Sequence, residues 1–292
     1  MTTLSAMLGS YPKTVALKTH SVSSPLVQLD FADIEVAQKG FKDVVRETKY
    51  DVAELAIVTF LLAHEAGKPY LLLPFVMNGG FHHKSILCRA GSGLGPRELA
   101  GKNVAMRSYS QTTPTWVRGI LSDEYGAHTP DVHWLTQEGA HVAEYEDPAW
   151  TTRIGSDRSL EELLVSGEVD AIIAGSGLSG DPRVQTLIPQ PDEAALEWYG
   201  RTHVVPINHV VTIRKEIADT RPDLVRAVFR LLVDSRAAAG PQPSPGPDLQ
   251  PTGFADVRTS IETAIRFAHE QELISKEYAV EELYGSVLGA LT

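Results

Sequence analysis

The sequence predicts an α/β fold of two domains with a ligand cleft between them. Short apolar segments alternate with segments of helical periodicity through most of the chain, which is typical of sheets covered by helices. The length of 292 residues suits two domains of ordinary size. After residue 214 the pattern is almost entirely helical, so we infer that the chain leaves a first domain, builds a second and returns. We therefore expect residues 1–105 and 208–292 to form the first domain and residues 106–207 to form an inserted second domain.

The first half of the chain alternates between strand and helix patterns. Short apolar or alternating runs predict strands at residues 14–18, 51–57, 70–76, 85–89 and 104–106. Apolar side chains at helical spacing predict helices at residues 34–46, 58–65 and 96–100.

The second half continues the alternation and then becomes helical. Strands are predicted at residues 132–136, 170–174 and 204–213, and residues 137–158 are expected to be irregular. Helices are predicted at residues 159–165, 192–198, 216–238, 254–272 and 276–291. We interpret Gly240–Gly253, which is rich in proline, as a surface loop or tether. Gly175–Gly180 is interpreted as a turn at the rim of the cleft, because it lacks the pattern of a phosphate-binding loop.

Composition excludes several classes of partner. The net charge of -11 argues against nucleic acid or an anionic membrane as the main partner, although it allows a local pocket for a small anion. The single cysteine, Cys88, cannot form an intrachain disulfide. The N-terminal residues lack the features of a secretory signal, and no run of about 18 apolar residues is present, so we expect a cytoplasmic protein that makes no use of a membrane. A homo-oligomer is left open.

Residues 104–123 predict a strand end, a polar turn and a helix. Five hydroxyl residues and Gln111 fall between Ser108 and Thr113. We expect Thr113 to cap the helix and Pro114 to occupy its first position, where a missing N–H costs nothing. Such a turn directs hydroxyl groups and free backbone N–H groups at one point, as anion sites do. An ordinary capped helix is the alternative.

Several motifs resemble the 4,5-dihydroxyphthalate decarboxylase family. They are D-V-A-E-L-A (51–56), F-H-H-K-S-I (81–86), L-A-G-K-N-V (99–104), W-V-R-G-I-L (116–121) and P-I-N-H-V-V-T-I-R (206–214). The resemblance runs in order from about residue 14 to residue 240. It implies a two-domain type 2 periplasmic-binding-protein-like fold, as in the substrate-binding proteins of ABC transporters. The chain departs from the family at His82-His83-Lys84, at Asn208 and in the hydroxyl-rich turn, so the exact substrate is open.

The resemblance also implies that a small aromatic carboxylate binds in the cleft and loses CO2 without an organic cofactor. The reaction needs a proton at the ring carbon, and histidine is a suitable acid because its pKa lies near neutrality. We expect the oxygens of the ligand to be held by the turn side chains, namely Ser108, Ser110, Gln111, Thr112 and Thr113. Arg118 is expected to hold a carboxylate, or to pair with Glu54 or Asp123.

The candidate proton donors are His82, His83, His209 and Glu54. If residues 82 and 83 are extended, their side chains face opposite sides, so one enters the pocket; a surface histidine pair is the alternative. Glu54 lies in an apolar strand, so it must be paired or protonated, either as a catalytic acid or as part of a structural ion pair with His82, His83 or Arg118. His209 would close over the ligand, or it is a hinge histidine packed against backbone. We expect no metal, although histidines with Glu54 leave a divalent ion open; adjacent histidines are no established zinc spacing.

Three functions fit these features. The first is a decarboxylase of a hydroxylated aromatic dicarboxylate such as 4,5-dihydroxyphthalate. The second is a non-catalytic small-carboxylate-binding protein of a transport or sensing system. The third is another enzyme on the same fold, such as one that builds a cofactor precursor. The absence of a secretory signal favours an enzyme.

Overall fold

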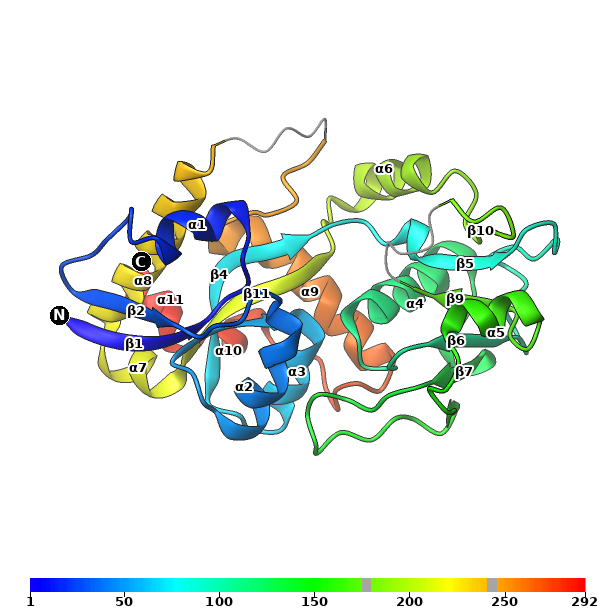
Figure 1. The fold of residues 1–292 in the computed structure, drawn as a ribbon, viewed down its shortest axis with the longest axis horizontal. Coiled ribbons are helices and arrows are strands. Elements are labelled where there is room, and N and C mark those ends of the chain that lie inside the picture. The colour runs from blue at the N-terminus through cyan, green and yellow to red at the C-terminus, as the bar shows by residue number, and fades with distance from the viewer. Residues whose placement is uncertain (175–179, 241–245, 292) are drawn as a thin grey trace.

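Two mixed sheets organise the chain, and the computed structural model describes residues 1–174, 180–240 and 246–291 (Figure 1). The first sheet has the strand order β2-β1-β3-β11-β4. Its strands are β1 (Thr2–Met7), β2 (Val27–Phe31), β3 (Val52–Ala56), β4 (Tyr70–Gly79) and β11 (Ile207–Arg214). β1 pairs in parallel with β2 and β3, whereas β11 runs antiparallel to β3 and β4.

The second sheet has the strand order β10-β5-β9-β6-β7-β8. Its strands are β5 (Ile86–Arg89), β6 (Asn103–Met106), β7 (His133–Thr136), β8 (Thr151–Arg153), β9 (Ala171–Ile173) and β10 (Val184–Thr186). β6 pairs in parallel with β7 and β9, and β5 pairs antiparallel with β9 and β10. In each sheet, parallel ladders therefore occupy one side, from β2 to β3 and from β9 to β8, and antiparallel pairs occupy the other side.

Helices cover both sheets (Figure 1). They are α1 (Pro12–Lys18), α2 (Phe41–Glu47), α3 (Ile57–Glu65), α4 (Thr112–Tyr125), α5 (Leu160–Ser166), α6 (Pro191–Thr202), α7 (Lys215–Thr220), α8 (Pro222–Ala238), α9 (Phe254–Glu270), α10 (Val280–Tyr284) and α11 (Ser286–Leu291), with 3-10 turns η1 (Ala37–Gly40), η2 (His83–Ser85) and η3 (Thr129–Asp131). A continuous apolar core includes side chains from both sheets, and a smaller cluster lies under α5. Within the described residues, no helix has the length and apolar character needed to cross a membrane.

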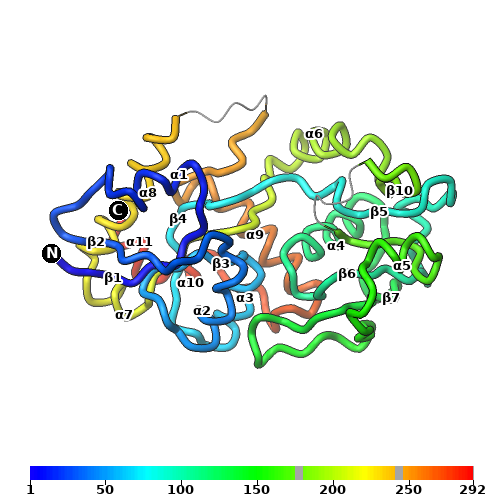
Figure 2. The backbone as a smooth tube through the Cα atoms, viewed as in Figure 1, coloured from blue at the N-terminus to red at the C-terminus, as the bar shows by residue number. Residues whose placement is uncertain are grey.

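The chain passes between the sheets twice, between β4 and β5 and between α6 and β11 (Figure 2). The return to the first sheet falls between the end of α6 at Thr202 and the start of β11 at Ile207. The outward passage is at residues 80–85, whereas the sequence analysis put it near residue 105; β5 and β6 both pair within the second sheet. The sequence prediction missed this because β5 and β6 read as further strands of an unbroken alternation, and only hydrogen-bonded pairing assigns a strand to a sheet.

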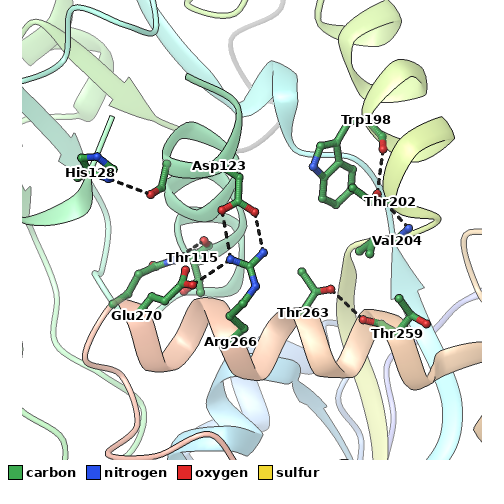
Figure 3. A network of polar contacts seen from close by, with 12 residues as sticks. Thr115, Asp123, His128, Trp198, Thr202, Val204, Thr259, Thr263, Arg266 and Glu270 are labelled. Carbon is green, nitrogen blue, oxygen red and sulfur yellow. Dashed lines mark hydrogen bonds and ion pairs between the residues drawn. The ribbon is translucent and has the colours of Figure 1, made fainter. Parts of the chain in front are cut away.

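Helix α9 packs against both α3 and α4, so it joins the two halves of the molecule. Arg266 on α9 forms an ion pair with Asp123 on α4 and with Glu270 on its own helix (Figure 3). Gly119 of α4 faces the Phe267 ring, and a Cβ atom at this glycine would lie 2.2 Å from the ring. The two helices approach closely because this position carries no side chain.

One predicted strand is a helix. Residues 14–18 lie in α1, which begins at Pro12, and the Thr14 hydroxyl accepts a hydrogen bond from the Tyr11 backbone N–H at 2.9 Å. Proline at the first helical position fixes a suitable φ angle and lacks only an N–H that has no partner there. The first strand is instead Thr2–Met7, in a segment for which no strand was predicted.

Other differences are local. The predicted helix at residues 96–100 is a series of turns, and the predicted helix at 34–46 is shorter, with η1 followed by α2. The short strands β2, β8 and β10 were not predicted. The predicted helix 216–238 is divided into α7 and α8 at Pro222, which cannot donate a backbone hydrogen bond. The proposed turn at Gly175–Gly180 lies outside the described residues apart from its last glycine.

Candidate functional site

Glu54 is a fully buried carboxylate in the middle of β3, where all five residues are buried. Its Oε2 atom accepts a hydrogen bond from the Gly9 backbone N–H at 2.8 Å. Its Oε1 atom accepts one from the Tyr11 hydroxyl at 2.7 Å and lies 2.6 Å from Nδ1 of His209. An ionised carboxylate is only an acceptor, so three converging donors suit it well. His82, His83 and Arg118 were the expected partners, but the hydrogen bonds and ion pairs of Glu54 within the described residues involve none of them.

His209 reaches Glu54 because of the register between β11 and β3. His209 lies opposite Ala56, and Val211 lies opposite Glu54. Residues two apart on a strand share a face, so His209 and Glu54 are diagonal neighbours on one face of the sheet. With Nδ1 donating to Glu54, Nε2 of His209 is the second ring nitrogen, and it lies 3.5 Å from Nε2 of Gln38. The carboxylate thereby holds the His209 ring in one orientation through Nδ1.

Tyr11 completes the surroundings of the carboxylate. It precedes α1 and extends its hydroxyl to Glu54. Burial, followed by the charge of Glu54 and the hydrogen bond to it, raises the pKa of the Tyr11 hydroxyl well above its ordinary value. The hydroxyl therefore keeps its proton and acts as a donor.

The hydroxyl-rich turn after β6 faces the start of α3. The Thr112 hydroxyl accepts a hydrogen bond from the backbone N–H of Val58 at 3.3 Å, which links the first turns of α3 and α4. The Ser108 and Ser110 hydroxyls are 3.2 Å apart, and Ser108 also donates to the Gly139 carbonyl at 3.3 Å. Two positive helix ends and several hydroxyl groups therefore meet between the two sheets.

The start of α4 differs slightly from the prediction. The helix begins at Thr112 with Gln111 as its N-cap, whereas Thr113 was predicted as the cap. Pro114 is then the third helical residue, which is still within the first four positions where a backbone N–H has no intrahelical partner. Gln111 and Thr113 are both half-buried.

His82 and His83 are not on an extended strand, because η2 begins at His83. His82 is buried, and its Nε2 lies 2.6 Å from Oδ1 of Asn208, which ties together the two chain passages between the sheets. His83 packs against the rings of Phe81 and Trp198. Burial lowers the pKa of each imidazole to about 4, so both are neutral near pH 7. Neither is suited to donate a proton at that pH.

Arg118 stabilises the fold, and its guanidinium group is not available to bind a ligand at the hydroxyl-rich turn. Its side chain is completely buried, with Nε donating to Oε1 of Gln271 at 2.7 Å and Nη2 donating to the Tyr109 carbonyl at 2.7 Å. The guanidinium also lies 3.8 Å from the centre of the Tyr109 ring. It pairs with neither Glu54 nor Asp123, the two acidic partners that the sequence suggested; Asp123 pairs with Arg266. We therefore remove Arg118 from the candidate binding residues.

Four further residues surround the candidate site and were not suggested by the sequence: Tyr11, Gln38, Phe41 and His141. The Phe41 ring makes edge contacts with the imidazoles of both His209 and His141, at centroid distances of 5.3 and 5.6 Å. His141 comes from the irregular segment after β7 and lies 2.9 Å, through Nδ1, from the Thr59 hydroxyl. No periodic pattern marks this segment, so only its three-dimensional contacts identify it.

A cavity of about 490 Å³ elsewhere is a poor place for an acidic ligand. It is lined by the end of α3, by Val142 and residues 144–146, and by the chain from the end of α9 onward; the candidate site residues are not part of it. Its lining includes Glu65, Glu144, Glu146 and Glu272, which would repel a carboxylate. Among the described residues there is also no group of three His, Cys, Asp or Glu side chains that could hold a metal ion.

No family model matches the chain. The 4,5-dihydroxyphthalate decarboxylase of Comamonas testosteroni is 30% identical over 236 residues, which cover 73% of this chain and 70% of that enzyme. The chain belongs to the 4,5-dihydroxyphthalate decarboxylase family. Two of the motifs on which the resemblance was based, D-V-A-E-L-A and P-I-N-H, meet in space as the Glu54–His209 pair.

Solved structures show the fold. The alkanesulfonate-binding protein SsuA from Xanthomonas axonopodis pv. citri, bound to MOPS, has a TM-score of 0.60 at 15% identity and covers 96% of this chain and 97% of its own. The desulfurization enzyme DSZB has a TM-score of 0.54 at 16% identity, covering 100% and 99%. At these identities the likeness concerns the fold alone, which is the two-domain type 2 periplasmic-binding-protein fold expected from the sequence.

Proposed function

We propose that this decarboxylase-family protein removes CO2 from a hydroxylated aromatic dicarboxylate such as 4,5-dihydroxyphthalate, with His209 as the proton donor. The observation that carries the proposal is the 2.6 Å contact between Nδ1 of His209 and the buried Glu54 carboxylate. A histidine held in this way has a fixed orientation, and a positioned imidazole is a suitable general acid. Family membership supports the class of reaction.

The proposed step moves one proton and breaks one bond. The imidazolium Nε2–H of His209 gives its proton to the ring carbon that bears the departing carboxylate, so a C–H bond forms there. The C–C bond to the carboxylate then breaks, its electron pair returns to the ring, and CO2 leaves. Neutral His209 regains a proton from solvent. Glu54 takes no part in the transfer and keeps the imidazole oriented through Nδ1.

We propose that the ligand lies between two domains, consisting of residues 1–79 with 207–292 and of residues 86–202. The remaining carboxylate would be held by the first turns of α3 and α4 together with nearby side chains. These are Ser108, Ser110, Gln111, Thr112 and Thr113. Positive helix ends and hydroxyl donors support oxyanion binding at this place without a buried cation.

The test is decarboxylation of 4,5-dihydroxyphthalate, followed as CO2 release and formation of 3,4-dihydroxybenzoate. For His209→Asn we expect kcat to fall by at least about 100-fold, the ordinary contribution of a positioned acid, with a much smaller change in KM. The matched control is His133→Asn on β7, because His133 is exposed. Wild-type kcat in folded His209→Asn protein would remove His209 from the chemistry.

Binding without catalysis is the alternative function. The fold is shared with SsuA, a protein whose described role is alkanesulfonate binding. Tight binding of 4,5-dihydroxyphthalate by folded wild-type protein, with no CO2 released and no gain on addition of divalent metals, would favour this alternative over the decarboxylase.

A further inference from the structure

The segment after β7 crosses from the second sheet to the helices of the first. Arg46 on α2 donates hydrogen bonds to the carbonyl groups of His141, at 2.7 Å, and Ala140, at 3.3 Å. Lys68, just beyond α3, pairs with Glu144 at 2.5 Å. The segment is therefore anchored at residues 140–141 and again at Glu144, which gives the His141 imidazole a defined position.

The His141 ring is placed beside the candidate site. Its Nδ1 lies 2.9 Å from the Thr59 hydroxyl in the first turns of α3, and its ring meets Phe41 at an interplanar angle of 81°. Phe41 meets the His209 ring in the same manner, at 74°. The two imidazoles therefore have a common neighbour, and the Ser108 hydroxyl bonds to Gly139, two residues before His141.

The two histidines have different chemistry. His209 is bonded to a carboxylate, whereas the polar partner of His141 is a neutral hydroxyl. Burial and the positive charges of Lys42 and Arg107 lower the pKa of His141 to about 4, so this imidazole is neutral near pH 7. If the Thr59 hydroxyl donates to Nδ1, the ring proton is on Nε2, and His141 offers a single N–H donor to its surroundings.

We propose that His141 is a specificity-determining residue that donates its Nε2–H to a ring hydroxyl of the aromatic acid. The inference rests on the proposed function, which locates the ligand between the two domains. A neutral, single donor matches a hydroxyl oxygen better than a carboxylate, which is best held by charged groups or several donors. His141 therefore selects hydroxylated aromatic acids, while His209 performs the proton transfer.

The experiment measures binding of two acids that cannot be turned over by this reaction, 3,4-dihydroxybenzoate and benzoate, by isothermal titration calorimetry. For His141→Ala we expect the affinity for 3,4-dihydroxybenzoate to fall about 5- to 10-fold, and the affinity for benzoate to change by less than about twofold, because one neutral hydrogen bond is lost. His141→Gln, which keeps an N–H donor, should recover part of the preference. The matched control is His133→Ala, from the same half of the molecule.

The outcomes separate this inference from the proposed function. If the wild-type protein decarboxylates 4,5-dihydroxyphthalate but folded His141→Ala keeps the wild-type ratio of the two affinities, the inference is overturned and the function stands. If no decarboxylation occurs but the preference for the hydroxylated acid depends on His141, the function is overturned and the specificity role stands. Equal weakening of both acids would also overturn the inference, since it indicates a general structural effect.

Discussion

Replacing His83 with leucine should make the protein more resistant to acid. Both ring nitrogens of His83 are buried without a hydrogen-bond partner, and the side chain is only 2% exposed. Burial lowers its pKa from 6.5 to about 4. Between these two values the unfolded chain binds a proton at this position and the folded protein does not. Above pH 6.5 the imidazole is neutral in both states, so its protonation does not change the free energy of unfolding. As the pH falls toward 4, proton binding by the unfolded chain lowers that free energy by an increasing amount.

The magnitude follows from proton linkage. A pKa that is lower by about 2.5 in the folded state corresponds to a loss of roughly 3 kcal/mol below pH 4, of which about 2 kcal/mol is already lost at pH 5. His83→Leu should thus gain about 2 kcal/mol over the wild-type protein between pH 8 and pH 5. His82 and His141 also have pKa values lowered to about 4, so they make both proteins less stable in acid and cancel from the difference. An added gain at pH 8 is expected, because an unpartnered polar group no longer has to be buried.

The assay is urea unfolding of both proteins at pH 8, 7, 6 and 5 at constant ionic strength. The control is His133→Leu, where the exposed imidazole is solvated in both states and no comparable gain in acid is expected. Parallel stability profiles for wild-type protein and His83→Leu would show that the His83 imidazole is protonated equally easily in both states. That result would refute the conclusion that His83 is buried against Phe81 and Trp198 with no polar partner for its ring nitrogens.

Two further variants test the Glu54 site and the contact between the two halves. Tyr11→Phe removes one of the hydrogen-bond donors to Glu54. We expect kcat/KM to fall roughly 10- to 100-fold, because a hydrogen bond to a charged group is lost. An unchanged kcat/KM would mean that this donor is dispensable. Gly119→Ala should lower the free energy of unfolding by about 1–3 kcal/mol, because the added methyl group meets the Phe267 ring. The control is Gly200→Ala on α6, where the added methyl group has no neighbour within 4 Å and no comparable loss of stability is expected. Equal stability of these two alanine variants, measured by urea unfolding, would contradict the close approach of α4 and α9.

Local pattern was sufficient for much of the fold. The buried strand around Glu54, the strand 70–79 and the helix after the hydroxyl-rich turn were all predicted close to their observed places. These elements have strong apolar periodicity, clear caps or glycine and proline at their ends, and such signals depend only on neighbouring residues. Short edge strands such as β8 and β10 have three residues each, too few for a pattern to be recognised.

The candidate site was only partly readable for a different reason. Hydroxyl groups before a helix and a carboxylate within an apolar strand are visible in sequence, and so is the histidine of P-I-N-H. The role of each charged group depends on its partner, however. A buried ionisable side chain can be neutral, can be charged and paired, or can serve only to stabilise the fold. Arg118 illustrates this point. The sequence suggested that its guanidinium could hold a carboxylate of the ligand, but in the structure the group donates hydrogen bonds to Gln271 and Tyr109.

The sequence by itself determined the family, the two-domain α/β fold and the presence of a buried carboxylate that needs a partner. Only the tertiary structure decided that the partner is His209, 155 positions away, and that His141 lies beside the same phenylalanine. The physical reason is strand register: antiparallel pairing of β11 with β3 sets His209 diagonally from Glu54. A shift of one residue would turn every side chain of β11 to the opposite face, and no local pattern in either strand states which register is formed.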